Sequence, residues 1–317
     1  MKGLELSKKY YEAYGRDMLH GQFPELEGIL AVGLAGSGSE CFGYDDAVSR
    51  DHDFEPGFCI FIPDEDVIDE RTEFRLQRAY AHLPKEFLGY RRQILSPVGG
   101  NRHGVLRMRD FFISKCGSAD GQLSLRQWLL TPEYALAEAV NGEVFRDDSG
   151  SFTAVRNRLA CYPEDIRRKK LAGYLLTMAQ AGQYNYSRCI FRGETGAAQL
   201  AAGEFVNAAL HVIFLLNKVY MPYYKWSFRA LRELEKHEGM KNTLSHDLEY
   251  LISSGNSAEE AEKKDGLIGK IAECCVEKLR EQGLISAGGT DLERHAYAVN
   301  DTVADSVLRN MNVFAGV

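Results

Sequence analysis

The sequence lacks the cysteine and histidine spacings that structural metal sites and disulfide frameworks need. Its seven cysteines include no C-x-x-C pair, and its eight histidines show no ligand spacing. These absences argue against a zinc site and against a disulfide-stapled fold. We expect the cysteines to be buried, reduced thiols.

The sequence also lacks a long apolar run and an excess of positive charge. No apolar stretch approaches the ~20 residues that span a bilayer, and the N-terminal MKGLELSKK contains no apolar signal core. We therefore predict a cytoplasmic protein with no membrane partner. The formal net charge of −7 argues against broad nucleic-acid binding through neutralisation of phosphates.

The composition is that of a folded protein with room for two domains. The chain has 317 residues, of which 45% are hydrophobic. Short apolar runs and turns give way to long helical periods at about residue 150. We predict an α+β protein, with a mixed sheet and flanking helices at 1–150 and an all-α helical bundle at 151–317.

A small-residue turn follows the first apolar run. The run at 29–35 predicts a buried strand, and Gly36-Ser37-Gly38-Ser39 predicts a turn that leads into a short helix at 40–42. Backbone N–H groups at a helix start favour phosphate, because they are free donors at the positive end of the helix dipole. Gly36, Ser37 and Ser39 are therefore candidate nucleotide-binding residues.

An acidic pair precedes the second apolar run. Asp51 and Asp53 stand two residues apart before the apolar stretch at 58–62, so an extended chain directs both carboxylates to one face. Hard oxygen ligands of this kind suit Mg²⁺, which binds few protein groups and takes phosphate oxygens as the rest. Both acids are predicted as metal ligands and catalytic residues, and neighbouring Arg50 as a phosphate contact.

This order of strand, G-S turn, short helix, D-x-D and strand resembles the nucleotidyltransferase superfamily with a DNA polymerase β-like palm. The resemblance implies transfer of a nucleoside monophosphate from a nucleoside triphosphate, usually with Mg²⁺, by a palm paired with a helical bundle. The chain more closely resembles an uncharacterised bacterial domain-of-unknown-function family with a nucleotidyltransferase-like N-terminus. The motifs that suggest this family are Gly36–Glu40, Ser49–Asp53, Trp128-Leu129, Asn217-Lys218 and Pro222–Trp226.

One feature departs from the superfamily pattern. Catalytic members usually carry a third carboxylate on a later strand beside the D-x-D strand. The best candidate strand lies at 103–109 and offers no acid at its centre, whereas Asp110 follows it. Three interpretations stay open: Asp110 serves, another carboxylate such as Asp45 or Asp46 serves, or the site binds nucleotide with little or no turnover.

The helical half carries the second set of candidates. Lys225 and Arg229 are four residues apart, so both leave one face of a helix and are predicted to neutralise triphosphate charge. Neighbouring Trp226 or the tyrosines before it are candidates to stack on a base. The basic run at 167–170 is expected to form a solvated helix face, with contact to an RNA acceptor as the alternative.

The sequence therefore predicts a Mg²⁺-dependent nucleotidyltransferase that uses a nucleoside triphosphate, with ATP as the expected nucleotide. The acceptor hydroxyl, on a small molecule, an RNA or a protein, is left open, as is the oligomeric state. The alternative is a nucleotide-binding or partner-binding module on the same fold with weak or no catalysis, which the missing third acid favours.

Overall fold

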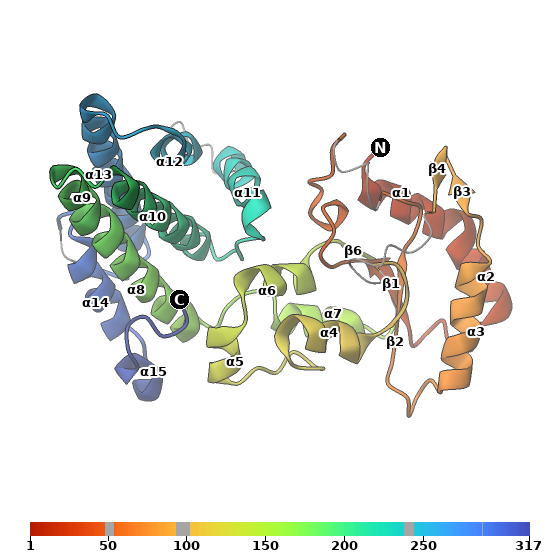
Figure 1. Ribbon diagram of the computed structural model, residues 1–317. Helices are drawn as coiled ribbons and strands as arrows, with labels where there is room; N and C mark the ends of the chain where they lie inside the picture. The colour runs from red at the N-terminus through yellow and green to blue at the C-terminus, as the bar shows by residue number, and fades with distance from the viewer. Residues whose placement is uncertain (48–53, 93–101, 238–243, 287) are drawn as a thin grey trace. The chain divides into compact units, whose positions relative to one another are not determined.

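The computed structural model describes residues 1–47, 54–92, 102–237, 244–286 and 288–317 (Figure 1). The chain divides into two compact units. The first comprises residues 1–124 and 134–160, and the second comprises residues 125–133 and 161–317. The fold is mixed, mostly helical, with a small mixed sheet in the first unit.

The main sheet of the first unit has the strand order β5-β2-β1-β6. Strand β1 pairs antiparallel with β2 and with β6, whereas β2 and β5 run parallel. The strands are β1 (Ala31–Leu34), β2 (Cys59–Ile62), β5 (Gly104–Arg107) and β6 (Glu143–Asp147), and a separate hairpin joins β3 (Glu86–Phe87) to β4 (Tyr90–Arg91).

The strands predicted at 29–35, 58–62 and 103–109 are confirmed. Strand β5 is shorter than expected, because helix α4 already begins at Met108. The segment after residue 143, expected to be a hairpin or loop, instead forms β6 and pairs with β1.

Helices cover both faces of this sheet (Figure 1). On one face, Val32, Ile60 and Ile62 join the core that the first three helices build. On the other face, Phe61 stacks on Phe152 of α7 with 4.0 Å between ring centroids, and it meets Phe111 of α4. Side chains alternate along a strand, so burial on both faces explains the continuous apolar run of β2.

The helices of the first unit begin with a continuous segment over residues 3–22, where the sequence predicts a helix at 4–20. For the next long helix, the sequence predicts a start at about residue 66. Asp69 caps this helix, α3, by accepting from the Thr72 N–H at 2.8 Å, so the helix starts later than predicted. The helices are α1 (Gly3–Tyr10), the π-helix η1 (Tyr11–Gly15), α2 (Arg16–Gln22), the 3₁₀ helix η2 (Glu40–Phe42), α3 (Glu70–Ala81), α4 (Met108–Cys116), α6 (Glu133–Val140), which starts in the second unit, and α7 (Ser151–Arg158).

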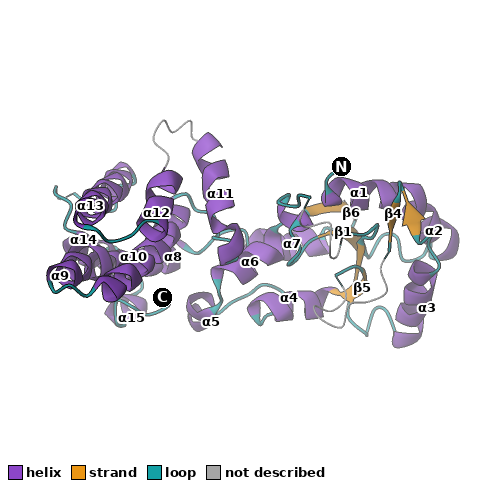
Figure 2. Ribbon diagram, turned by 45° about the horizontal axis from the view of Figure 1, so that its top comes forward, coloured by secondary structure: helices purple, strands orange, loops and turns teal. Residues whose placement is uncertain are grey.

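All regular secondary structure in the described part of the second unit is helical (Figure 2). Helix α8 packs against α10 and α14, and α10 also packs against α12. The segment 290–312, expected as one helix, forms two. The helices are α5 (Leu125–Leu130), α8 (Glu164–Met178), the π-helix η4 (Ala179–Tyr186), α9 (Ser187–Phe191), α10 (Thr195–Leu216), α11 (Tyr224–His237), α12 (Leu244–Ser253), α13 (Ala258–Glu281), α14 (Leu292–Asp301) and α15 (Ser306–Asn310).

Helix α10 is long and apolar enough to cross a membrane by composition, contrary to the expectation that no run approaches that length. Its most apolar window is 61% buried inside the protein. Ala202, Phe205 and Val212 are among its buried side chains. This burial is typical of the core helix of a soluble protein.

The basic run at 167–170 is not the solvated helix face that the sequence suggests. Arg167, Lys169 and Lys170 are buried, because the C-terminal segment folds back over α8. Lys169 Nζ donates to the Met311 carbonyl at 2.8 Å, and Lys170 Nζ donates to the Gly316 carbonyl at 2.6 Å. Charges buried with hydrogen-bond acceptors in this way hold the C-terminus in place.

Glu164 completes this cluster and makes its stability dependent on pH. Its carboxylate accepts from the Arg167 guanidinium at 2.6 and 3.0 Å and also pairs with Arg168. These contacts lower the pKa of Glu164 to about 2. The folded-state pKa lies below the ordinary glutamate pKa of 4.5, so the stabilisation is complete above pH 4.5 and is lost as the pH falls toward 2.

Glu164→Gln should reduce the free energy of unfolding at pH 7 by about 1 kcal/mol, a modest figure because solvent screens a half-exposed carboxylate. Urea unfolding at pH 7, 4 and 2.5 should show the difference from wild type shrinking as the pH falls. The exposed Glu262 of α13 provides the control, since Glu262→Gln should have no effect at pH 7. A difference in free energy of unfolding between Glu164→Gln and wild type that stays constant with pH would contradict this account.

Candidate functional site

A cleft of about 390 Å³ opens in the first unit where the chain leaves β1. The loop at 35–41 forms one wall, and Val105, Leu106 and Arg107 of β5 form another. Helix α4 contributes Asp110 and Lys115. The cleft therefore brings together the small-residue turn and β5, the strand on which a third acid is expected.

The loop departs from β1 at a residue that must be glycine. Gly36 has φ +125°, a backbone conformation that other residues rarely adopt. The side chain of Asn141, at the end of α6, holds it on both sides: the Gly36 N–H donates to Asn141 Oδ1 at 2.9 Å, and Asn141 Nδ2 donates to the Gly36 carbonyl at 2.7 Å. Arg156 in turn donates to the Asn141 carbonyl at 2.7 Å.

The next three residues leave two backbone donors free. The N–H groups of Ser37 and Ser39 make no hydrogen bond within the described ranges, whereas the Gly38 N–H is directed at the Cys41 sulfur. Ser37 is exposed and lines the cleft with Gly38, whereas half-buried Ser39 is not part of the lining. Free N–H groups on a loop beside a cleft are a suitable binding site for an anion.

Cations and acids both line this cleft. Arg107 is fixed by an ion pair with Glu73 at 2.6 Å and by the carbonyls of Pro63 and Ile68, so its role is structural. Lys115 pairs with Glu138 at 2.6 Å, and Arg102 lies on the same lining. This mixture suits a ligand that carries both anionic groups and a cation.

Three carboxylates line this cleft, and none is on β5: Glu73 of α3, which is paired with Arg107, Asp110 and Glu40. Strand β5 lies beside β2, as expected for the third strand, but it carries no acid. Asp110 lies in the first turn of α4, is exposed, and makes no ion pair within the described part of the chain. Glu40, in the 3₁₀ helix after the turn, is 8% exposed.

Asp45 is not a candidate for the missing carboxylate, because it is occupied elsewhere. It is buried, accepts from the Gly3 N–H at 3.0 Å and pairs with Lys2. These contacts fix the start of α1. A nucleophilic thiol is also absent from the lining, since burial raises the pKa of Cys41 well above its ordinary value and keeps the thiol protonated at neutral pH.

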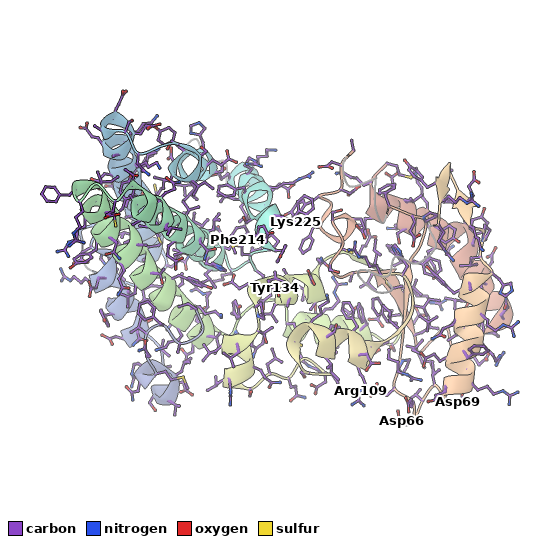
Figure 3. All side chains as sticks on the ribbon, in the orientation of Figure 1. Asp66, Asp69, Arg109, Tyr134, Phe214 and Lys225 are labelled. Atoms are coloured by element: carbon purple, nitrogen blue, oxygen red, sulfur yellow. The ribbon has the colours of Figure 1, made fainter. Side chains whose placement is uncertain are left out.

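The remaining expected site residues fall into two groups. Arg50, Asp51 and Asp53 lie outside the described residues. Lys225 and Arg229 belong to α11 of the second unit and flank one ring: Lys225 Nζ lies 5.2 Å and Arg229 Cζ lies 6.0 Å from the centroid of the Trp226 ring. Lys225 is exposed at the start of the helix (Figure 3).

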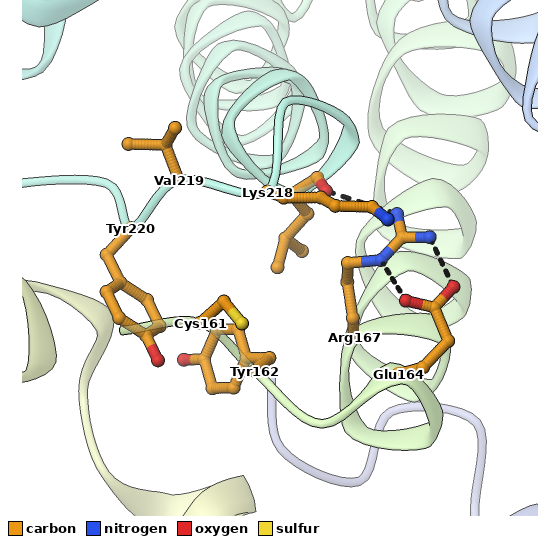
Figure 4. Close-up of a pocket in the computed structure, with 8 residues that line it drawn as sticks. Cys161, Tyr162, Glu164, Arg167, Lys218, Val219 and Tyr220 are labelled. Carbon is orange, nitrogen blue, oxygen red and sulfur yellow. Dashed lines mark hydrogen bonds and ion pairs between the residues drawn. The ribbon is translucent and has the colours of Figure 1, made fainter. Parts of the chain in front are cut away.

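The second unit has a smaller cavity of its own, of about 130 Å³ (Figure 4). Its lining includes Arg167, which is already paired with Glu164, and Lys218, which adopts a left-handed conformation with φ +56° after α10. The rings of Tyr162 and Tyr220 also line this cavity and meet edge to face, with 4.9 Å between their centroids. Its Arg167 and Glu164 serve the packing described above.

Sequence reasoning missed three features of the site. Asn141 positions the loop from 105 residues away, and nothing in its local pattern indicates this. The cleft-lining Arg102 and Lys115 stand outside any motif. Glu40 was included in a family motif and in a short helix but not as a site residue, although its place directly after Gly36–Ser39 was a usable signal. Four of the seven cysteines are buried, but Cys161 is exposed.

Comparisons with known proteins give one match. A family model described as "Domain of unknown function (DUF4037)" matches residues 128–227. This range is less than half of the chain, and it contains three of the five family motifs named above but not the turn or the acidic pair. The description names no reaction. No curated protein and no solved structure matches the chain.

Asn141→Leu should lower the free energy of unfolding by about 2 to 3 kcal/mol, because both backbone groups of Gly36 lose their partner while the side chain keeps its size. The same substitution at exposed Asn157 of α7, which makes no side-chain hydrogen bond in the part of the chain described, should change it by less than about 0.5 kcal/mol. Equal effects of the two substitutions in urea unfolding would show that Asn141 does not hold the loop.

Proposed function

We propose that this protein binds a nucleoside triphosphate with Mg²⁺ in the cleft of the first unit and transfers the nucleoside monophosphate to an acceptor hydroxyl. The observation that carries the proposal is the pair of free N–H groups of Ser37 and Ser39, on a loop that is fixed by Asn141 and that lines one cleft with Arg102 and Lys115. These groups are suited to hold the β- and γ-phosphates. The order of strands and turn that prompted the resemblance supports the same conclusion.

The described donors are compatible with Mg²⁺ only if phosphate completes the coordination. No group of three or more histidine, cysteine or carboxylate side chains lies within ligand distance in the described ranges. Mg²⁺ commonly takes one or two carboxylates together with substrate phosphates. Asp51 and Asp53 are proposed to hold the ion, which when bound would neutralise charge on the phosphates.

In the proposed reaction the acceptor oxygen forms a bond to the α-phosphorus, and the bond from that phosphorus to the β-phosphate oxygen breaks. Pyrophosphate leaves, and the hydroxyl proton passes to a carboxylate or to water. The loop N–H groups stabilise the negative charge that moves onto the leaving pyrophosphate. Positioning and charge stabilisation thus account for the chemistry, and the protein is proposed to act in the cytoplasm.

A second candidate function is binding without turnover. The observation that favours it is that β5 carries Leu106 and Arg107 where a third acid is expected, and that Arg107 is committed to Glu73. Release of pyrophosphate from ATP, GTP, CTP or UTP in the presence of a cell-extract acceptor fraction separates the two. Release supports the transferase, and tight binding without release supports the binding module.

Asp51→Asn and Asp53→Asn should each weaken Mg²⁺-dependent triphosphate binding at least tenfold, because each removes a charged ligand of the ion. Calorimetric titration of the four triphosphates, with Mg²⁺ and with EDTA, measures this directly. Asp66→Asn is the matched control, since Asp66 is exposed and makes no ion pair within the described residues. The assignment fails if the two site variants bind as the control does.

Lys225→Gln should weaken triphosphate binding about threefold to tenfold if Lys225 neutralises triphosphate charge, as the sequence predicts. Lys263→Gln is the control, because Lys263 is also exposed and also lies over an aromatic ring, 3.9 Å from the centroid of Tyr250. Identical affinities of the two variants would assign Lys225 a purely structural role beside Trp226.

A further inference from the structure

Glu40 is an acid whose burial has no structural explanation within the described residues. It lines the cleft and is 8% exposed. Its Oε1 atom is fully buried and has no hydrogen-bond partner, and its Oε2 atom has only the Ser39 hydroxyl at 3.5 Å. A carboxylate buried without partners destabilises a fold, so a protein that keeps one is expected to use it.

The carboxylate lies inside the loop that carries the free N–H groups. A Cβ added at Gly38 would overlap the Glu40 carboxylate, which places this group against the middle residue of the 37–39 segment. The stem of the side chain packs against Gly3 at the start of α1. The aliphatic part of the Glu40 side chain therefore packs against α1, whereas the carboxylate has no packing role.

An anion held by these N–H groups would be repelled by a carboxylate in the same loop. A divalent cation between the carboxylate and a phosphate removes this conflict, because it binds oxygens of both. Of the other two acids of this cleft, Asp110 is exposed and keeps its hydration, and Glu73 is paired with Arg107. The Cys41 thiol beneath the loop is protonated, as described above, and is a poor ligand for a hard cation.

We propose that Glu40 supplies a carboxylate ligand to a divalent cation that binds in this cleft together with the phosphates of the nucleotide. Glu40 then takes the place of the acid that β5 lacks, from the opposite side of the cleft. This assignment rests on the proposed function, because phosphate oxygens complete the coordination. It extends that function by naming a metal ligand in the turn itself.

The experiment is a titration of Mn²⁺, detected by electron paramagnetic resonance, into wild type, Glu40→Gln and the control Asp66→Asn. Each protein is titrated with and without α,β-methylene-ATP, an analogue that cannot transfer its nucleotide. Calorimetric titration of the same analogue in EDTA measures nucleotide binding separately.

The expected result is that Glu40→Gln weakens Mn²⁺ binding at least tenfold in the presence of the analogue, whereas Asp66→Asn binds as wild type does. Without metal, Glu40→Gln should melt at the same temperature as wild type or higher, because a neutral amide replaces an unpaired buried charge. A structural role for Glu40 predicts the opposite shift in melting temperature.

Two results would overturn the proposal. If Glu40→Gln binds Mn²⁺ as tightly as wild type does, Glu40 is not a ligand of the cation, whereas the proposed nucleotide binding is unaffected by this result. If wild type does not bind Mn²⁺, the proposed cation site is wrong. The titration of the analogue in EDTA then shows whether the proposed nucleotide binding is wrong as well.

Gly38→Ala provides a second variant that keeps the Glu40 charge but displaces it. The added methyl group requires the flexible end of Glu40 to move, and the φ of Gly38 lies outside the left-handed region, so alanine is tolerated there. Gly38→Ala should therefore weaken Mn²⁺ binding severalfold with little change in melting temperature. Unchanged Mn²⁺ affinity would count against a cation at this position.

Discussion

The first unit depends on how the chain leaves β1 at Gly36. Strand β1 pairs on both sides, with β2 and with β6, so its end is a fixed point in the sheet. Asn141 then satisfies both backbone groups of Gly36, and the N–H groups of Ser37 and Ser39 have no partner among the described residues. This loop is fixed at Gly36 and has N–H donors without partners. It is therefore preorganised for an anion, because binding would order little more of the chain.

Buried charge is used differently in the two units. In the second unit, Lys169 and Lys170 are surrounded by carbonyl and amide oxygens from the C-terminal segment, so their burial stabilises the fold. Glu40 in the first unit has a buried oxygen with no such partner. The contrast is the reason for treating Glu40 as functional and the basic run as structural, although the sequence alone suggested neither assignment.

The sequence predicted the parts of the fold that local patterns determine. Continuous apolar runs located β1 and β2, and the Gly-Ser turn located the loop that lines the cleft. Strand β6 was not recognised, because its half-buried residues become a strand only by pairing with β1. The roles of Asn141 and of the basic run depend on contacts more than 100 residues away in sequence, which no local pattern encodes.

Amide hydrogen exchange of the loop, with and without Mg²⁺ and ATP, tests the central claim most directly. The N–H groups of Ser37 and Ser39 have no partner among the described residues, so they should exchange rapidly in the free protein. If they bind phosphates, the addition of Mg²⁺ and ATP should slow their exchange by at least tenfold. Exchange that stays rapid at these two amides under saturating ATP would contradict the assignment of this cleft as a nucleotide site.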